Sequence, residues 1–180
     1  MDARTLALAY DRSAADYDEQ FRELQRTKYR AVFRVLPELE PGALVLDAGA
    51  GTGLLAEWLH APELRHATWA TALRIVALDR SRRMLAQAAR RGLVTLAGDL
   101  MAPPVKRAFD VAFAFTSLVG ADTVTPGLAA LRDTVKPGGV VAATVLRADV
   151  PSAVDLPGLQ RIAWSLEAGQ DLAFVWRVTR

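Results

Sequence analysis

One acidic residue stands beside a glycine-rich loop, in an arrangement that could bind a charged nucleoside. Residues 44–59 read LVLDAGAGTGLLAEWL, a pattern that predicts a strand, a loop and the first turns of a helix. Gly49, Gly51 and Gly53 remove side chains where the backbone must approach a ligand closely. The N–H groups at the start of the following helix favour an anionic group. The loop therefore predicts a site for a dinucleotide or for another nucleoside cofactor.

Asp47, at the end of the apolar run, separates these two kinds of ligand. A dinucleotide-binding loop has the pattern G-x-G-x-x-G, whereas here Gly53 comes one position early and Leu54 takes the expected place. A carboxylate at this point would repel a pyrophosphate and attract a cation. The amino-acid end of S-adenosylmethionine, with its ammonium and carboxylate, would suit both the acid and the helix terminus. The alternative is that the glycines only make a tight turn and Asp47 only caps it.

Two further acids close apolar runs of the same form, RIVALD and LVTLAGD. Asp79 is suited to bidentate hydrogen bonds with ribose hydroxyls, although it follows the loop at more than the usual distance of about 20 residues. Asp99 could accept from an adenine amino group while the Leu100 N–H meets a ring nitrogen. The carboxyl ends of parallel strands face one crevice, so we expect the acids to converge there. Alternatively, Asp79 is a helix N-terminal acid and Asp99 a turn acid.

Apolar runs of strand length alternate with helical patterns along the chain. Such runs are typical of a parallel sheet buried on both faces. The alternation predicts a doubly wound, mostly parallel Rossmann-like α/β sheet with helices on both faces in a single domain. The expected strands are residues 43–47, 74–79, 93–99, 109–115, 139–146 and 172–178. The expected helices are residues 21–36, 52–60, 81–91, 126–135 and 157–167, the fourth with Thr125 as its cap and Pro126 at its first position.

Composition limits the class of protein. The chain has 180 residues, 52% of them hydrophobic, which predicts one folded domain. The net charge of +2 is too near zero to indicate a nucleic-acid partner. The chain has no Cys, which excludes disulfides and thiolate metal sites. The longest apolar run, residues 111–121, is too short to cross a bilayer, and the acidic N-terminus is not that of a signal peptide. We therefore expect a soluble, cytoplasmic protein without a membrane partner.

The order of these motifs resembles the class I S-adenosylmethionine-dependent methyltransferase family, over about residues 10–146. VLDAGAGTG resembles its first motif, VALDRSRRML its second, and LAGDL with FDVAFAF its third and fourth; LRDTVKPGGVVAATVL resembles the helix–strand unit that follows. AYDRSAADYDEQF resembles the N-terminal lid of the small-molecule branch. The resemblance implies S-adenosylmethionine as the cofactor and methyl transfer to a small-molecule acceptor by in-line displacement. It also implies a helical lid at residues 1–40 and a cofactor-binding domain at residues 41–180.

The resemblance also assigns roles to single residues. Asp47 and the loop at residues 49–53 would hold the methionine part, Asp79 would hold the ribose, and Arg80 and Met84 would flank the adenine.

The remaining roles fall on the fourth strand and the lid. Phe115 and Thr116 would face the methionine part and the substrate. Tyr10 and Tyr17 would lie over the cofactor, or alternatively pack a helix onto the core. The implied cofactor-binding residues are Tyr17, Asp47, Gly49, Ala50, Gly51, Gly53, Asp79, Arg80, Met84, Asp99, Leu100, Phe115 and Thr116.

The tail departs from the family pattern. The family closes its sheet with a helix and usually two strands, but here residues 157–167 are interpreted as the helix and only 172–178 as a strand. A missing strand would leave an open edge at which two copies could pair, so a monomer and a homodimer both stay open.

The acceptor and the general base are not identified by the sequence. A base is needed only if the acceptor keeps its proton. Asp122, Asp149 and His60 are candidates, although such residues are more often solvated or structural. Two His without a cluster of acids predict no metal site.

Three alternatives to a small-molecule methyltransferase remain open. Arg82, Arg83, Arg90 and Arg91 could form an RNA-binding face, although a solvated helix face is the more ordinary interpretation. An RNA or protein methyltransferase is therefore one alternative, and a non-catalytic cofactor-binding or partner-activating subunit is another. An NAD-dependent oxidoreductase is the most distant, because Asp47 and the glycine spacing oppose it.

Overall fold

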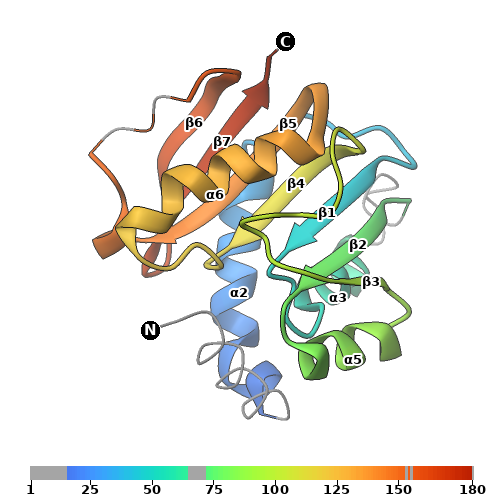
Figure 1. Ribbon diagram of the computed structural model, residues 1–180. Coiled ribbons are helices and arrows are strands. Elements are labelled where there is room, and N and C mark those ends of the chain that lie inside the picture. Colours follow the sequence, from blue (N-terminus) through green and yellow to red (C-terminus); the bar gives the residue numbers. More distant parts are fainter. Residues whose placement is uncertain (1–15, 65–71, 153, 155, 180) are drawn as a thin grey trace.

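The computed structural model describes residues 16–64, 72–152, 154 and 156–179. Within these residues one seven-stranded sheet has the order β3-β2-β1-β4-β5-β7-β6 (Figure 1). Neighbours from β3 to β5 pair in parallel, whereas β7 is antiparallel to both β5 and β6. The expectation of a doubly wound, mostly parallel sheet is confirmed. The strands are β1 (Leu44–Ala48), β2 (Arg74–Asp79), β3 (Val94–Ala97), β4 (Phe109–Phe115), β5 (Val135–Leu146), β6 (Leu159–Ala168) and β7 (Asp171–Val178).

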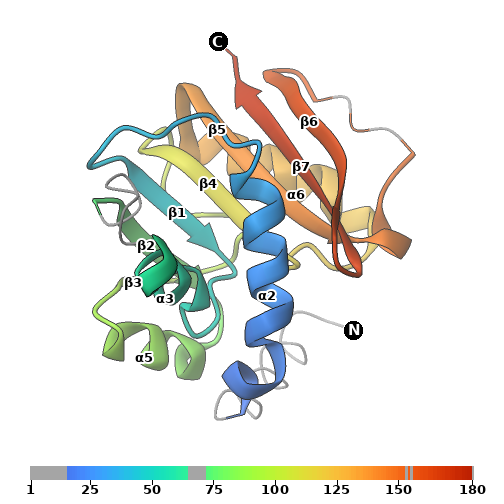
Figure 2. The same cartoon turned by 180° about the vertical axis from the view of Figure 1, so that it is seen from behind.

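Helices cover both faces of this sheet, as expected. Seen from behind, α2, α3 and α5 lie on one face, and α6 lies on the other (Figures 1 and 2). Successive residues of β1 alternate between the two cores, with Val45 in one and Leu46 in the other. The helices are α2 (Tyr17–Phe33), α3 (Leu54–Leu59), α5 (Arg82–Arg90) and α6 (Ala121–Thr134), with short 3-10 turns η1 (Pro62–Leu64) and η2 (Arg147–Asp149). None of the helices in the described ranges is long and apolar enough to span a bilayer.

The long helix α2 is part of the core. Its Tyr29 and Phe33 rings lie 4.7 Å and 5.3 Å, centroid to centroid, from Phe115 and Phe113 of β4. Residues 1–15 of the expected lid, including Tyr10, lie outside the described residues. The described part of the lid segment therefore forms one wall of the sheet's packing, with its first turn reaching beyond the ends of the strands (Figure 2).

The expectation of a helix at residues 157–167 is wrong, because this segment is the strand β6. It forms a hairpin with β7 through a turn at Gly169, which has φ 72°. The register shifts between Arg161 and Ala163 and again between Ala163 and Leu166. The apolar residues of this segment follow one another at helical spacing, and the two shifts interrupt the alternation by which a strand would be recognised. The second closing strand of the family pattern is therefore present.

Helix α6 and strand β3 also differ from expectation. Helix α6 begins after Gly120, so Thr125 is not its cap and Pro126 lies in the second turn, where it removes one backbone N–H donor without ending the helix. Strand β3 is short and lies at the edge of the sheet, and the Val94 side chain is 66% exposed. The apolar character of this run therefore does not reflect burial on both faces.

Phe113 joins β4 to α2 in the centre of the core, so its truncation should destabilise both. The residue is fully buried and stacks on Phe33 and Phe115. We expect Phe113→Ala to lower the free energy of unfolding by about 3–5 kcal/mol, measured by urea denaturation. Phe113→Leu, which keeps most of the volume, should cost about 1.5 kcal/mol or less. Equal losses in the two variants would contradict this account of the packing.

Candidate functional site

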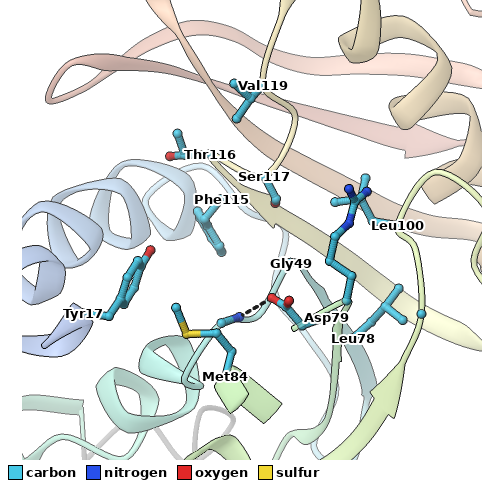
Figure 3. Close-up of a pocket in the computed structure, with 13 residues that line it drawn as sticks. Tyr17, Gly49, Leu78, Asp79, Met84, Leu100, Phe115, Thr116, Ser117 and Val119 are labelled. Atoms are coloured by element: carbon cyan, nitrogen blue, oxygen red, sulfur yellow. Dashed lines mark hydrogen bonds between the residues drawn. The ribbon is translucent and has the colours of Figure 1, made fainter. Parts of the chain in front are cut away.

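The main pocket lies where the chain reverses its direction across the sheet, beyond the ends of β1 and β4. Chain connections leave these neighbouring strands toward opposite edges, which is where open α/β sheets form a crevice. The pocket holds about 650 Å³ of empty space, part of it open to solvent. In Figure 3, Tyr17, Phe115 and Thr116 lie on one side, and Leu78, Asp79 and Leu100 on the other. The lining is Tyr17, Gly49, Gly51, Leu78, Asp79, Arg80, Met84, Gly98, Leu100, Phe115, Thr116, Ser117 and Val119.

The glycine loop shapes this pocket because its glycines have no side chains. Gly49 has φ 77°, and a Cβ there would lie 2.3 Å from the Cβ of Ser117, so no side chain fits. Gly51 has φ 56°, and the nearest atom to its Cβ position is a ring carbon of Tyr17, 4.0 Å away. A side chain at Gly51 would therefore occupy pocket space between the loop and α2.

The N–H groups of the loop are largely used within the protein. Gly49 and Ala50 donate to the Leu78 carbonyl at 2.8 Å and 3.0 Å. Gly51 donates to Oδ2 of Asp79 at 2.8 Å, while Oδ1 of Asp79 accepts from the Ser81 N–H at 2.8 Å. These bonds hold the loop against β2. The loop therefore contributes a fixed backbone shape to the pocket, and few of its N–H groups are free to bind a ligand.

Asp79 keeps hydrogen-bonding capacity toward the pocket. Burial raises the pKa of its carboxyl, and the bonds from Ser81 and Gly51 act in the opposite direction. The Arg80 N–H is a third backbone group that favours the charged carboxylate. A carboxylate has about four lone-pair sites, so the side chain can still accept a further hydrogen bond, as from a hydroxyl group.

A smaller cavity next to the main pocket brings the Asp47 carboxyl group and the Gln25 side chain together. Burial, and then the negative charge of Asp79, raises the pKa of Asp47 to about 7. Gln25 is 7% exposed, and its Oε1 has no hydrogen-bond partner among the described residues. A buried carboxylate and a buried amide oxygen that lacks a partner among the described residues suit a cation that can donate hydrogen bonds. The cavity is lined by Tyr17, Gln25, Tyr29, Asp47, Gly49, Ala50, Leu54 and Phe115.

Most of the residues expected at the site converge on these two cavities, with two exceptions. Gly53 lines neither; a Cβ there would lie 2.7 Å from Leu93, so this glycine allows helix α3 to pack. Asp99 also lines neither, and its Oδ1 accepts from Nη2 of Arg80 at 2.8 Å and from the Met101 N–H at 2.9 Å. The expected residues that line a cavity are Tyr17, Asp47, Gly49, Ala50, Gly51, Asp79, Arg80, Met84, Leu100, Phe115 and Thr116.

Sequence reasoning missed the contribution of α2. Gln25, Lys28 and Tyr29 all lie on the buried side of this helix. The available signal was two polar side chains, Gln25 and Lys28, in the register of an apolar helix face, where polar residues are costly unless they have a partner. The other lining residues that were not expected are Leu54, Leu78, Gly98, Ser117 and Val119.

None of the three candidate bases lines the main pocket. The Nδ1 of His60 lies 2.7 Å from the Ala56 carbonyl, in a separate groove beside Glu57 and Arg91. Asp149 accepts from the Gly120 N–H at 2.9 Å. In the part of the chain that the structure describes, no group of three His, Asp or Glu side chains could hold a metal ion.

A charged network fastens the first turn of α2 to the glycine loop. Arg91 donates to Asp18, to the Thr52 carbonyl and, at 3.1 Å, to Glu57. The Thr52 hydroxyl donates to Oδ1 of Asp18 at 2.5 Å. Arg91, one of the four arginines considered as an RNA-binding face, thus binds residues that support the pocket.

The end of β4 carries a strained residue. Thr116 has φ 52°, a left-handed conformation that is unfavourable for a β-branched side chain. Strain of this kind costs about 1–3 kcal/mol and persists only where surrounding contacts enforce it. Here the Thr116 N–H donates to both the carbonyl and the hydroxyl of Thr144, at 3.0 Å and 3.1 Å.

Comparison with known proteins decides the family. Residues 45–139 match the family described as "Methyltransferase domain". The chain belongs to the class I S-adenosylmethionine-dependent methyltransferases. Its cofactor is S-adenosylmethionine.

Two curated relatives of this methyltransferase are malonyl-[acyl-carrier protein] O-methyltransferases. That of Enterobacter lignolyticus is 32% identical over 91% of this chain and 60% of the relative. That of Pseudescherichia vulneris is 33% identical over 81% of this chain and 55% of the relative. The chain spans about 60% of the length of the first of these relatives.

Solved structures share the fold of this methyltransferase. A complex between the Haloferax volcanii Trm112 methyltransferase activator and the putative methyltransferase matches with a TM-score of 0.68 and 17% identity, covering 95% of this chain and 98% of the other. The DhpI–SAH complex matches with a TM-score of 0.58 and 24% identity, covering 97% and 78%. At these identities the likeness extends to the fold alone.

The chemistry of the pocket fits this cofactor. S-adenosylmethionine carries an ammonium group, a ribose diol and an adenine. The small cavity offers Asp47 and the unpartnered Oε1 of Gln25 for a cation, the main pocket offers Asp79 for a diol, and Met84 and Leu100 provide apolar surface. A diphosphate would instead meet the buried carboxyl of Asp47, the half-buried carboxyl of Asp79 and a loop whose donors are largely used.

The buried carboxyl of Asp47 should make the free protein less stable at high pH. Its pKa of about 7 lies above the usual 3.8, so the folded state holds a proton that the unfolded chain releases. The free energy of unfolding should therefore fall as pH rises from about 4 to 7 and stay level above. We expect Asp47→Asn to be more stable than wild type by about 2–4 kcal/mol at pH 8 and equal to it near pH 4, measured by urea denaturation without cofactor.

Asp133→Asn, a substitution at an exposed site on α6, is the matched control and should follow wild type at every pH. A stability difference between Asp47→Asn and wild type that does not change with pH would contradict the assignment.

Proposed function

We propose that this methyltransferase transfers the methyl group of S-adenosylmethionine to a small-molecule acceptor by in-line displacement. The observation that carries the proposal is one continuous pocket with a cofactor side and a second side. Asp79, Met84 and Leu100 form the first, while Phe115 and Thr116 form the second (Figure 3). A recessed pocket of this kind suits a small acceptor better than it suits a flat macromolecular surface.

Within this proposal the residues of the cofactor side have distinct roles. Asp47 and Gln25 would bind the ammonium group, Asp79 the ribose hydroxyls, and Met84 and Leu100 the adenine. Arg80, paired with Asp99 at 2.8 Å, would close the outer edge of the adenine site.

The chain's part in the reaction would be alignment. The bound cofactor would supply a methyl group on a positively charged sulfur, which is a good leaving group. Tyr17 and Phe115 would wall off the reacting end and exclude water, so that the acceptor approaches from one direction. Correct placement alone can lower a barrier by several kcal/mol.

The acceptor class is supported by the relatives. Their printed activity is O-methylation of a malonyl group carried on an acyl-carrier protein, which is a small carboxylate at the end of a longer carrier. We infer that a small carboxylate or its thioester-linked form is the acceptor here. A carboxylate has already lost its proton, so such a reaction needs no general base, in agreement with a pocket that none of the three candidate bases lines.

Asp79 should contribute strongly to cofactor binding. Removing its carboxylate deletes the proposed bonds to the ribose and the 2.8 Å bond that holds the Gly51 N–H. We expect Asp79→Ala to weaken S-adenosylhomocysteine binding by about 1.5–3 kcal/mol in isothermal titration calorimetry. Asp133→Ala, far from the pocket on α6, should leave the affinity at its wild-type value. An unchanged affinity in Asp79→Ala would remove this residue from the site.

Turnover should be seen with a small acid and not with RNA. We expect radiolabelled methyl groups to pass from S-adenosylmethionine to a member of a panel of malonyl thioesters and short carboxylic acids, with one S-adenosylhomocysteine formed per methyl transferred. Cofactor binding without turnover on the whole panel would favour a non-catalytic subunit. A salt-dependent shift of RNA together with methylation of RNA would favour the nucleic-acid alternative.

A further inference from the structure

A buried polar cluster lies behind the pocket wall, where α2 meets the ends of β4 and β7. The side chains of Lys28 and Asp171 are 2% and 0% exposed, and Nζ lies 3.2 Å from Oδ2. Lys28 donates a hydrogen bond to Oγ1 of Thr116, which in turn donates to Oδ2 of Asp171. The Thr144 hydroxyl lies 3.4 Å from Oγ1 of Thr116. One hydroxyl group thus connects the N-terminal helix, the pocket wall and the closing hairpin.

Stability alone does not account for this ion pair. Burial is the largest effect on the Lys28 ammonium and lowers its pKa, against the attraction of Asp171. The second oxygen of Asp171, Oδ1, has no hydrogen-bond partner within the described residues. A well-packed apolar pair of similar volume is often as stable as a buried ion pair, or more so. The value of the pair therefore lies in what it holds in place.

What it holds is the strained Thr116. This residue has φ 52°, and its two neighbours, Phe115 and Ser117, both line the pocket. Ser117 also donates to the Ala48 carbonyl at 2.7 Å, directly before the glycine loop. If Thr116 relaxed to an ordinary backbone conformation, Phe115 and Ser117 would turn together and the wall would lose its shape. Lys28 and Asp171 are not among the described residues that line the pocket, and the lining residue to which both are hydrogen-bonded is Thr116.

We propose that Lys28 and Asp171 are positioning residues that hold Thr116 in its left-handed conformation, and so aim Phe115 and Ser117 at the end of the pocket where cofactor and acceptor meet. The inference rests on the proposed function for what occupies this end. It predicts that the pair matters for a ligand with an amino-acid part and not for adenosine, which reaches only the side of Asp79.

The test combines removal of the pair with relief of the strain. In Lys28→Met/Asp171→Leu we expect S-adenosylhomocysteine to bind about tenfold more weakly, with adenosine affinity unchanged, both by calorimetry. Glycine adopts a positive φ without a steric penalty. Because Thr116 itself lines the pocket, Thr116→Gly alone is the reference for this comparison. Adding Lys28→Met/Asp171→Leu to Thr116→Gly should change the affinity by less than about threefold, since glycine needs no support to keep a positive φ.

A second variant weakens the support of Thr116 without changing the charges of Lys28 and Asp171. Thr144→Val keeps the shape of the side chain and the ion pair but removes the hydroxyl that accepts from the Thr116 N–H. It should weaken S-adenosylhomocysteine in the same selective way and have little effect when added to Thr116→Gly. If Lys28→Met/Asp171→Leu does not fold, this comparison still tests whether the ligand needs Thr116 to be held in its conformation, and unchanged affinity in Thr144→Val would contradict the proposal.

Three results would overturn the positioning role. Wild-type affinity in Lys28→Met/Asp171→Leu would make the pair purely structural. An equal loss when the pair is removed from Thr116→Gly would mean that Lys28 or Asp171 acts on the ligand by another route than Thr116. An equal loss for adenosine would indicate general disorder of the pocket. Failure of the proposed function is a separate result, because wild-type protein would then bind no S-adenosylhomocysteine before any substitution is made.

Discussion

The rest of the site is arranged around a carboxyl group at the buried end of β1. Asp47 is 3% exposed, and burial raises its pKa toward neutrality, so the charged form is costly in the free protein. The neighbouring groups do not relieve this cost: Gln25 adds a second unpartnered acceptor, and Asp79 adds a second negative charge. A cationic ligand removes the conflict, whereas a neutral or anionic one does not. Because these groups offer negative charge and an unpartnered acceptor, the site favours a cationic ligand. The same arrangement lowers the stability of the folded protein when no ligand is bound.

The second constraint is that one helix serves both the core and the pocket. Along one face of α2, Tyr29 packs on Phe115, Gln25 faces the small cavity and Lys28 reaches Thr116. The Arg91 network fastens the start of the same helix to the glycine loop. A displacement of α2 would therefore disturb the hydrophobic packing, the cation cavity and the wall of β4 at once. This is a physical reason to regard the segment as part of the domain as well as a cover over it.

Local patterns in the sequence predict some of these features and not others. The strand–loop–helix unit around Gly49 is readable, because a continuous apolar run, closely spaced glycines and an acid are all adjacent in the chain. Strand β6 is not, because its two register shifts interrupt the apolar–polar alternation by which a strand is recognised in a sequence. Neither is the partner of Lys28: Asp171 is distant in sequence, and only the antiparallel insertion of β7 beside β5 brings it to β4. Short-range chemistry is thus predictable here, whereas contacts that depend on sheet order are not.

The position of β7 has a consequence for biosynthesis. This strand follows every other strand in the chain, yet it lies inside the sheet, between β5 and β6, and its first residue supplies the carboxylate beneath Thr116 (Figure 2). During translation, the glycine loop and the first five strands can emerge and pair while the wall beside them still lacks its support. A nascent chain would therefore acquire the side of the pocket around Asp79 first. The side around Thr116 would be completed only when residues 171–178 leave the ribosomal exit tunnel.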